Sequence, residues 1–213
     1  GWSHGPGSAS LLIHVNKARE GRWKEFSNKL FRNCTAFLYT KHHNGFQVVA
    51  REFSSQEMTD LLHNPDASFP GANKALKNGN TSTVWAIAVN GHDVVVKRYN
   101  VKGFWHGLKL SLFTGRGERS WVNGYRLLFC GIPTPRPVAL LKMRAGLFST
   151  TVYLLSELVQ FVSAKKLFRD PGVSDGEKEA MAEQIAQTLH KLQQQQISHG
   201  DLKASNILIS DGE

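Results

Sequence analysis

The stretch that decides the fold reads His199-Gly200-Asp201-Leu202-Lys203-Ala204-Ser205-Asn206. Apolar residues at helical spacing precede it, and a short apolar run at 207–209 follows it, so we expect it to join a helix to a strand. The loop carries a carboxylate, an amine and an amide close together. The simpler alternative is a helix–strand connection whose polar residues are incidental.

The spacing of these groups matches the kinase catalytic loop, His-x-Asp-Leu-Lys-x-x-Asn. A chance match at its five fixed positions is on the order of one in ten thousand. Phosphoryl transfer needs a carboxylate that orients the attacking hydroxyl, which predicts that role for Asp201. Lys203 can reach the γ-phosphate, and the amide oxygen of Asn206 can bind Mg²⁺. His199 is expected to hold the loop rather than to take part in the chemistry.

Groups that hold a nucleotide are predicted further towards the N-terminus. Lys97 closes the apolar stretch 94–96, which is where kinases keep the lysine that binds the α- and β-phosphates. The turn before this hairpin contains Gly79, Asn80 and Thr81, whose backbone N–H groups and hydroxyl can meet phosphate oxygens. It has one glycine where the usual phosphate loop has three, so its position supports the assignment more than its composition does.

Two further positions are candidates for ATP binding. Glu118 lies 21 residues after Lys97, near the start of a predicted helix. It can pair with Lys97 and hold it, although the helix dipole favours an acidic residue there in any case. Glu157 and Val159 follow a buried apolar stretch and are predicted to form a hinge whose backbone meets the adenine ring.

Periodicity and turn residues predict the surrounding elements. Asn90 and Gly91 form a two-residue turn between strands, because both residues tolerate positive φ. Ser174 and Glu177 fit a capping box at the start of a long helix. We expect strands at 83–89, 93–99, 138–143, 150–155 and 207–209, helical segments at 102–113 and 118–129, and the capped helix up to residue 196.

The first 68 residues are harder to interpret. Trp23, Phe26 and Leu30 fall on one face of a basic amphipathic helix, and residues 36–39 and 46–50 are candidate strands of a hairpin. We therefore expect three parts. They are an upstream segment, 1–68, of uncertain role; an N-lobe with its hinge, 69–159; and the start of a C-lobe with the catalytic loop, 160–213.

The charge balance predicts an anionic partner. Lys and Arg number 26 against 17 Asp and Glu, a net charge of +9, which suits phosphates, an acidic lipid surface or nucleic acid. No nucleic-acid motif is present, so no nucleic acid is expected. Residues 97–126 interleave basic and aromatic side chains, which favours contact with an anionic membrane surface; a core-facing helix with solvated basic residues is the alternative. Two distant cysteines and no apolar run of spanning length predict a cytoplasmic protein with peripheral membrane contact.

From about residue 60 to 209, the chain resembles the bacterial lipopolysaccharide kinases, a family of Kdo and heptose kinases that are WaaP-type or InaA-like. The matching blocks are 76–85, 95–103, 105–106, 120–124, 131–135 and 199–206. The resemblance implies an α+β, protein-kinase-like fold, with an antiparallel-sheet N-lobe that carries one helix and a helical C-lobe. It also implies ATP and Mg²⁺ as cofactors. The implied reaction phosphorylates a heptose or Kdo of the lipid-linked lipopolysaccharide core at the cytoplasmic face of the inner membrane.

One departure from the kinase pattern is at the end of the chain. Glu213 lies seven residues after Asn206, whereas kinases place a second metal-binding Asp about a dozen residues after this Asn. Asp211 is better interpreted as part of a hairpin turn. We therefore expect a truncated C-lobe and poor phosphate transfer by this chain alone. Two alternatives stay open: a kinase-like phosphotransferase for a protein or small molecule, and a non-catalytic pseudokinase or binding module.

Overall fold

The computed structural model describes residues 6–71, 74–99, 115–145, 149–198, 200 and 202–209. The chain divides into two compact units. The first unit comprises Gly1–Phe129 and Pro133–Leu158, and the second comprises Cys130–Ile132 and Val159–Glu213.

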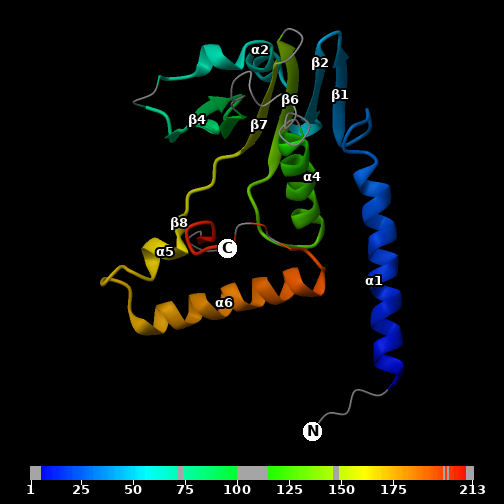
Figure 1. Ribbon diagram of the computed structural model, residues 1–213, viewed down its shortest axis with the longest axis vertical. Coiled ribbons are helices and arrows are strands. Elements are labelled where there is room, and N and C mark those ends of the chain that lie inside the picture. The colour runs from blue at the N-terminus through cyan, green and yellow to red at the C-terminus, as the bar shows by residue number, and fades with distance from the viewer. Residues whose placement is uncertain are drawn as a thin grey trace. The chain divides into compact units, whose positions relative to one another are not determined.

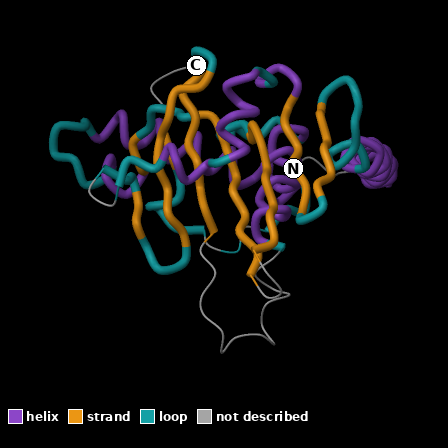
Figure 2. The backbone as a smooth tube through the Cα atoms, turned by 90° about the horizontal axis from the view of Figure 1, so that it is seen from above, coloured by secondary structure: helices purple, strands orange, loops and turns teal. Residues whose placement is uncertain are grey.

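A seven-stranded sheet forms the centre of the first unit (Figures 1 and 2). Its strand order is β1-β2-β6-β7-β5-β4-β3, and every neighbouring pair is antiparallel. The strands are β1 (Phe37–His42), β2 (Gly45–Ala50), β3 (Lys77–Asn78), β4 (Ser82–Val89), β5 (His92–Tyr99), β6 (Pro137–Ala145) and β7 (Ser149–Glu157). The sequence pattern is visible in β5, where Val94 and Val96 are fully buried and the residues between and after them are half-buried.

The turn between β4 and β5 confirms the predicted hairpin. Asn90 has a φ of 50° and Gly91 a φ of 77°, both in the left-handed region. This conformation matches the twist of the flanking strands, and it allows Val89 to pair with His92 directly across the turn.

Helix α4 (Arg116–Phe129) lies on one face of this sheet, against β6 and β7 (Figure 1). The contact is too close for side chains at two positions. A Cβ atom at Gly117 would lie 2.3 Å from Val152 Cγ1, and one at Gly124 would lie 2.5 Å from Pro137 Cγ. Glycine at these positions therefore lets the helix approach the strands. The predicted helix at 118–129 is confirmed.

The opposite face is covered by short helical segments that follow β2. These are η1 (Arg51–Phe53), α2 (Gln56–His63) and η2 (Pro65–Ser68). Trp85 of β4, which is fully buried, donates from Nε1 to Ser68 Oγ at 3.0 Å and packs against Phe69 with ring centroids 5.3 Å apart. Apolar side chains thus fill both faces of the sheet, and the core of the first unit is continuous.

The N-terminal segment is part of this unit. Strand β2 pairs with β6 from Gly45 opposite Met143 to Val49 opposite Ala139. The predicted hairpin is confirmed as β1 and β2, and the predicted amphipathic helix corresponds to α1 (Pro6–Ser27) and the turns after it. The segment whose role the sequence left open extends the sheet by two strands.

An aromatic cluster joins this segment to α4. The ring of Phe37 lies 5.8 Å from Trp121 and 5.0 Å from Tyr125, centroid to centroid, and Trp121 Nε1 donates to the carbonyl of Leu30 at 3.3 Å. Burial raises the pKa of Tyr125, so its hydroxyl stays protonated and donates to the Pro137 carbonyl at 2.7 Å. Edge-to-face contacts of this kind stabilise a core beyond the area they bury.

The described residues of the second unit form a short strand pair and two helices. Strand β8 (Val162–Ser163) pairs with β9 (Leu208–Ile209), and β8 leads directly into α5 (Ala164–Leu167). Helix α6 (Asp175–Gln194) begins at the predicted capping box, in which Ser174 and Glu177 exchange hydrogen bonds. No helix in the described part of the chain combines the length and the apolar character that crossing a bilayer requires.

Candidate functional site

Lys97 lies on an interior strand of the sheet, β5, on the face that α4 covers. In β5 it pairs with Val84 on one side and Leu154 on the other. Its Nζ lies 5.0 Å from the ring centroid of Tyr99, which is two residues along the strand and therefore on the same face. The Tyr99 hydroxyl is 2.9 Å from Ser120 Oγ of α4. Lys97 is thus half-buried beside the helix, and an aromatic ring stabilises its charge.

The candidate phosphate-binding turn connects β3 to β4. The N–H of Gly79 donates to the Ser82 carbonyl at 3.1 Å, and Thr83 Oγ1 lies 3.5 Å from Asn78 Oδ1. These contacts hold the base of the turn. Asn80 and Thr81 at its tip are exposed, so a ligand can reach their polar groups.

The pairing that the sequence suggested for Glu118 is not formed. Glu118 Oε1 accepts from Lys142 Nζ at 2.5 Å, and the structure records no ion pair between Glu118 and Lys97 among the described residues. The sheet register explains this partner. Lys142 pairs with Val152, and Val152 pairs with Tyr99, so the three side chains form one row beneath α4. The first turn of α4 packs on that row, with Gly117 against Val152.

The second oxygen of Glu118 is a notable feature of this face. Glu118 Oε2 is buried and has no hydrogen-bond partner within the described residues. A buried acceptor without a donor is unfavourable, and charged groups carry the largest penalty. This oxygen can therefore accept a second cation without loss of the contact to Lys142. Lys97 lies two residues from Tyr99, in the neighbouring row of the same sheet face.

The predicted hinge residues lie where the two units divide. Glu157 is the last residue of β7, and its N–H donates to the Arg136 carbonyl at 3.0 Å. The N–H of Leu158 donates to the Asp93 carbonyl at 2.9 Å. A contact between Glu157 and an adenine ring must therefore use a group other than this N–H. Val159 is the first residue of the long segment of the second unit.

The catalytic-loop sequence is described in part. His199 and Asp201 lie outside the described residues, whereas Lys203 and Asn206 lie within them and are exposed. The N–H of Asn206 donates to the Lys203 carbonyl at 2.8 Å, which closes a turn, and Ser205 Oγ lies 3.5 Å from Asn206 Oδ1. The turn therefore fixes the backbone of Asn206 relative to that of Lys203.

Helix α5 anchors this loop, a role that the sequence did not suggest. The N–H of Ala164 donates to the Ile207 carbonyl at 2.9 Å, and the N–H of Lys165 donates to the Ala204 carbonyl at 3.1 Å. The available signal was Ser163, which caps α5 by accepting from the N–H of Lys166 at 3.3 Å. A helix of four residues gives no periodicity that could reveal it.

The metal-binding prediction depends on Asn206. Its side-chain amide supplies an oxygen, the type of ligand that Mg²⁺ prefers. In the part of the chain that the structure describes, there is no group of three or more His, Cys, Asp or Glu side chains that could hold a metal ion. Asp201 and Asp211 lie outside that part.

The basic and aromatic segment 97–126 is described only at its ends. The predicted helical segment 102–113 lies outside the described residues. Trp121, which was a candidate for lipid contact, is fully buried against Phe37 and Tyr125. Arg98 forms an ion pair with Asp66 at 3.0 Å. For Trp121 the lipid interpretation is therefore wrong, because the N-terminal segment covers the side chain.

These features define the class of protein. An antiparallel sheet carries helix α4 on one face and Lys97 on an interior strand, and a helical unit contains the His-x-Asp-Leu-Lys-x-x-Asn loop. This is an α+β, protein-kinase-like fold, as the sequence predicted. The sequence profile of the lipopolysaccharide kinase (Kdo/WaaP) family matches residues 72–213, and the chain belongs to this family.

Two solved structures are similar to the chain. A structure of WaaP in complex with acyl carrier protein shares 16% identity with a TM-score of 0.43, and the match covers 65% of this chain and 54% of that one. The MAP kinase LmaMPK10 from Leishmania major shares 22% identity with a TM-score of 0.49, and the match covers 73% of this chain and 47% of that one. The chain thus spans about half the length of each protein. No curated protein matches the chain at a significant level.

Proposed function

We propose that this chain carries the nucleotide-binding and catalytic-loop residues of an ATP-dependent kinase that phosphorylates a heptose or Kdo sugar of the lipopolysaccharide core. The family match over residues 72–213 carries the proposal, because it includes both Lys97 and the loop from His199 to Asn206. The reaction is the transfer of a phosphoryl group to a sugar hydroxyl, and MgATP supplies that group.

The roles follow from the chemistry of each group. Lys97 binds the α- and β-phosphates, and Glu118, whose second carboxylate oxygen has no donor among the described residues, is available to hold that lysine. The turn with Gly79, Asn80 and Thr81 covers the phosphates. The adenine lies against the backbone of the hinge at Glu157 and Val159.

The acceptor side of the reaction uses the catalytic loop. Asp201 orients the sugar hydroxyl and accepts its proton, and Lys203 offsets the charge that develops on the transferred group. Asn206 provides an oxygen ligand for Mg²⁺. The acceptor is lipid-linked, which places the protein peripherally at the cytoplasmic face of the inner membrane, where the net charge of +9 favours an anionic surface.

Acceptor choice tests the proposal. The full-length protein is incubated with ATP labelled at the γ-phosphate and, in parallel, with lipopolysaccharide core oligosaccharide, a mixture of proteins and an aminoglycoside. We expect Mg²⁺-dependent label in the oligosaccharide alone, and a loss of about 10²–10⁴-fold in the rate for Asp201→Ala. Label only in the protein or the aminoglycoside would show a different acceptor. No label in any acceptor would indicate a non-catalytic module.

A further inference from the structure

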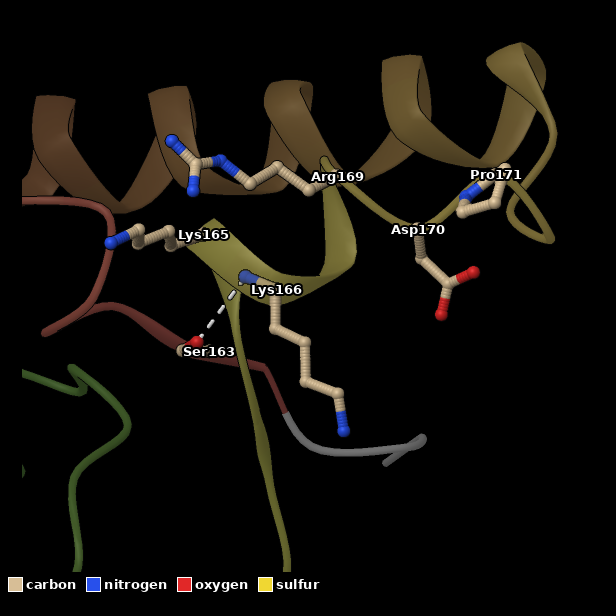
Figure 3. A pocket seen from close by; sticks show the side chains of 6 residues that line it. All are labelled: Ser163, Lys165, Lys166, Arg169, Asp170 and Pro171. Carbon is tan, nitrogen blue, oxygen red and sulfur yellow. Dashed lines mark hydrogen bonds between the residues drawn. The ribbon is translucent and has the colours of Figure 1, made fainter.

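The second unit contains a basic cavity, wide open to solvent, beside the catalytic loop (Figure 3). It measures about 440 Å³, within the range of about 300–1,000 Å³ that is common for small-ligand sites. It is lined by Ser163, Lys165, Lys166, Arg169, Asp170 and Pro171. Three cations and one carboxylate give this lining a net positive charge, whereas most drug-like pockets are lined mainly by apolar side chains.

Helix α5 and the turn that follows it present these cations to solvent. Ala164 and Leu167 are buried and fix the helix to its unit, whereas Lys165, Lys166 and Arg169 are exposed. Residues four apart lie on the same side of a helical turn, and Figure 3 shows the side chains of Lys165 and Arg169 extending in the same direction. Because the backbone is already fixed, binding of a common ligand has to order only these side chains.

No side chain in the described residues neutralises the three cations. Lys165, Lys166 and Arg169 take part in none of the ion pairs that the structure records there. The carboxylate of Asp170 instead accepts from the N–H of Gly172 at 2.9 Å. Like charges that line one pocket repel one another, so a bound anion stabilises the group.

The same backbone positions the cavity next to the catalytic loop. The N–H of Lys165 donates to the Ala204 carbonyl, and the N–H of Ala164 donates to the Ile207 carbonyl. Ala204 lies within the turn that contains Asn206, and Ile207 follows it directly. A ligand bound by Lys165 therefore lies close to the loop whose residues we propose for phosphoryl transfer.

From this arrangement we infer that Lys165, Lys166 and Arg169 bind the negatively charged groups of the acceptor sugar, its carboxylate or phosphates, and so hold the acceptor beside the catalytic loop. Lysine and arginine both form charge-assisted hydrogen bonds with such groups. The inference rests on the proposed function and adds a substrate-binding site to it.

Binding of core oligosaccharide to the full-length protein, measured by calorimetry, tests the inference. The probe is the oligosaccharide with its carboxylates and phosphates, compared with the same material after dephosphorylation and methyl esterification. We expect the triple variant Lys165→Ala, Lys166→Ala and Arg169→Ala to bind the charged probe at least about tenfold more weakly. Added salt should weaken wild-type binding, and the neutral probe should bind wild type and variant equally weakly.

A matched control variant removes three positive charges from a different part of the chain. The variant Lys17→Ala, Arg22→Ala and Lys24→Ala takes three exposed cations from α1, and we expect it to bind the probe like the wild type. Circular dichroism checks that both variants are folded. Equal losses in the two variants would overturn the inference, because they would reflect net charge alone. Wild-type-like binding by the α5 variant would also overturn it, as would equally tight binding of inorganic phosphate.

The same proteins separate this inference from the proposed function. ATP binding should be unchanged in the α5 variant, and its loss of activity should appear as a higher KM for the acceptor with little change in kcat. If the wild type binds the oligosaccharide but transfers no phosphate, the proposed function fails. If the wild type transfers phosphate and the variant has an unchanged KM, this inference fails.

Discussion

Glu118 shows how one side chain connects the helix to the sheet. One carboxylate oxygen contacts Lys142 of β6, and the other is buried with no partner among the described residues. The sequence placed Glu118 on a helix correctly, because helical periodicity is local. It could not identify Lys142 as the partner, because that contact depends on the pairing of β6 with β7 and of β7 with β5. The sequence also placed Lys97 on a strand correctly, because Lys97 follows a recognisable apolar stretch.

Removal of Lys142 from its ion pair with Glu118 should destabilise the protein. We expect Lys142→Met to lower the free energy of unfolding by about 1–3 kcal/mol, because the partly buried Glu118 carboxylate loses the only donor that it has among the described residues. Urea unfolding measures the loss. In the double variant Lys142→Met with Glu118→Gln, the loss should be smaller, because no uncompensated charge remains. If the double variant were less stable than Lys142→Met, loss of the ion pair would not explain the lower stability of Lys142→Met.

At the scale of elements, the sequence predicted the features that depend on local signals. It did not predict which strands that are distant in the sequence would pair. The turn at Asn90 and Gly91 and the capping box at Ser174 depend on neighbouring residues, and the structure confirms both. The pairing of β2 with β6 joins strands far apart in the sequence, and no turn or periodicity encodes it. Helix α5 was missed because it is only one turn long.

The cap of α6 gives a prediction about stability and pH. Hydrogen bonds from Ser174 lower the pKa of Glu177 below its ordinary value. A lowered pKa in the folded state means that the contribution to stability is complete above the ordinary pKa of Glu and is lost as the pH falls below it. We expect Ser174→Ala to cost about 1 kcal/mol at neutral pH.

Urea unfolding of the second unit at neutral and acidic pH measures this effect. The difference between wild type and Ser174→Ala should shrink as the pH falls through the lowered pKa of Glu177, because below that pKa Glu177 is protonated in both proteins. Ser174→Asn is the control, since asparagine is also a good N-cap and should retain most of the stability. A difference that stays constant with pH would show that Glu177 does not take part in the cap.

At the scale of the whole molecule, the N-terminal segment completes the first unit. Its hairpin extends the sheet, and Phe37 contacts Trp121 and Tyr125 of α4. Its aromatic residues are compatible with several roles, so the sequence alone left the function of this segment open. The structure shows that they pack on the helix that carries Glu118. The segment thereby supports the position of α4 on the sheet.

Truncation of Phe37 tests this support. Phe37 is 2% exposed, and we expect Phe37→Ala to lower the free energy of unfolding by about 3–5 kcal/mol, the range for a large buried aromatic side chain. Lys41→Ala in the same strand is the control, because Lys41 is exposed and its loss should change stability by less than about 0.5 kcal/mol. Equal stability of the two variants would contradict the packing of this segment on α4.

The most direct test of the proposed catalytic residues is a crystal structure of the full-length protein with Mg²⁺ and a non-hydrolysable ATP analogue. We predict hydrogen-bond contact between Lys97 Nζ and the α- or β-phosphate, Asn206 Oδ1 within the coordination distance of Mg²⁺, about 2.1 Å, and the Asp201 carboxylate facing the γ-phosphate. A nucleotide bound elsewhere, or one that contacts neither Lys97 nor Asn206, would contradict the proposal.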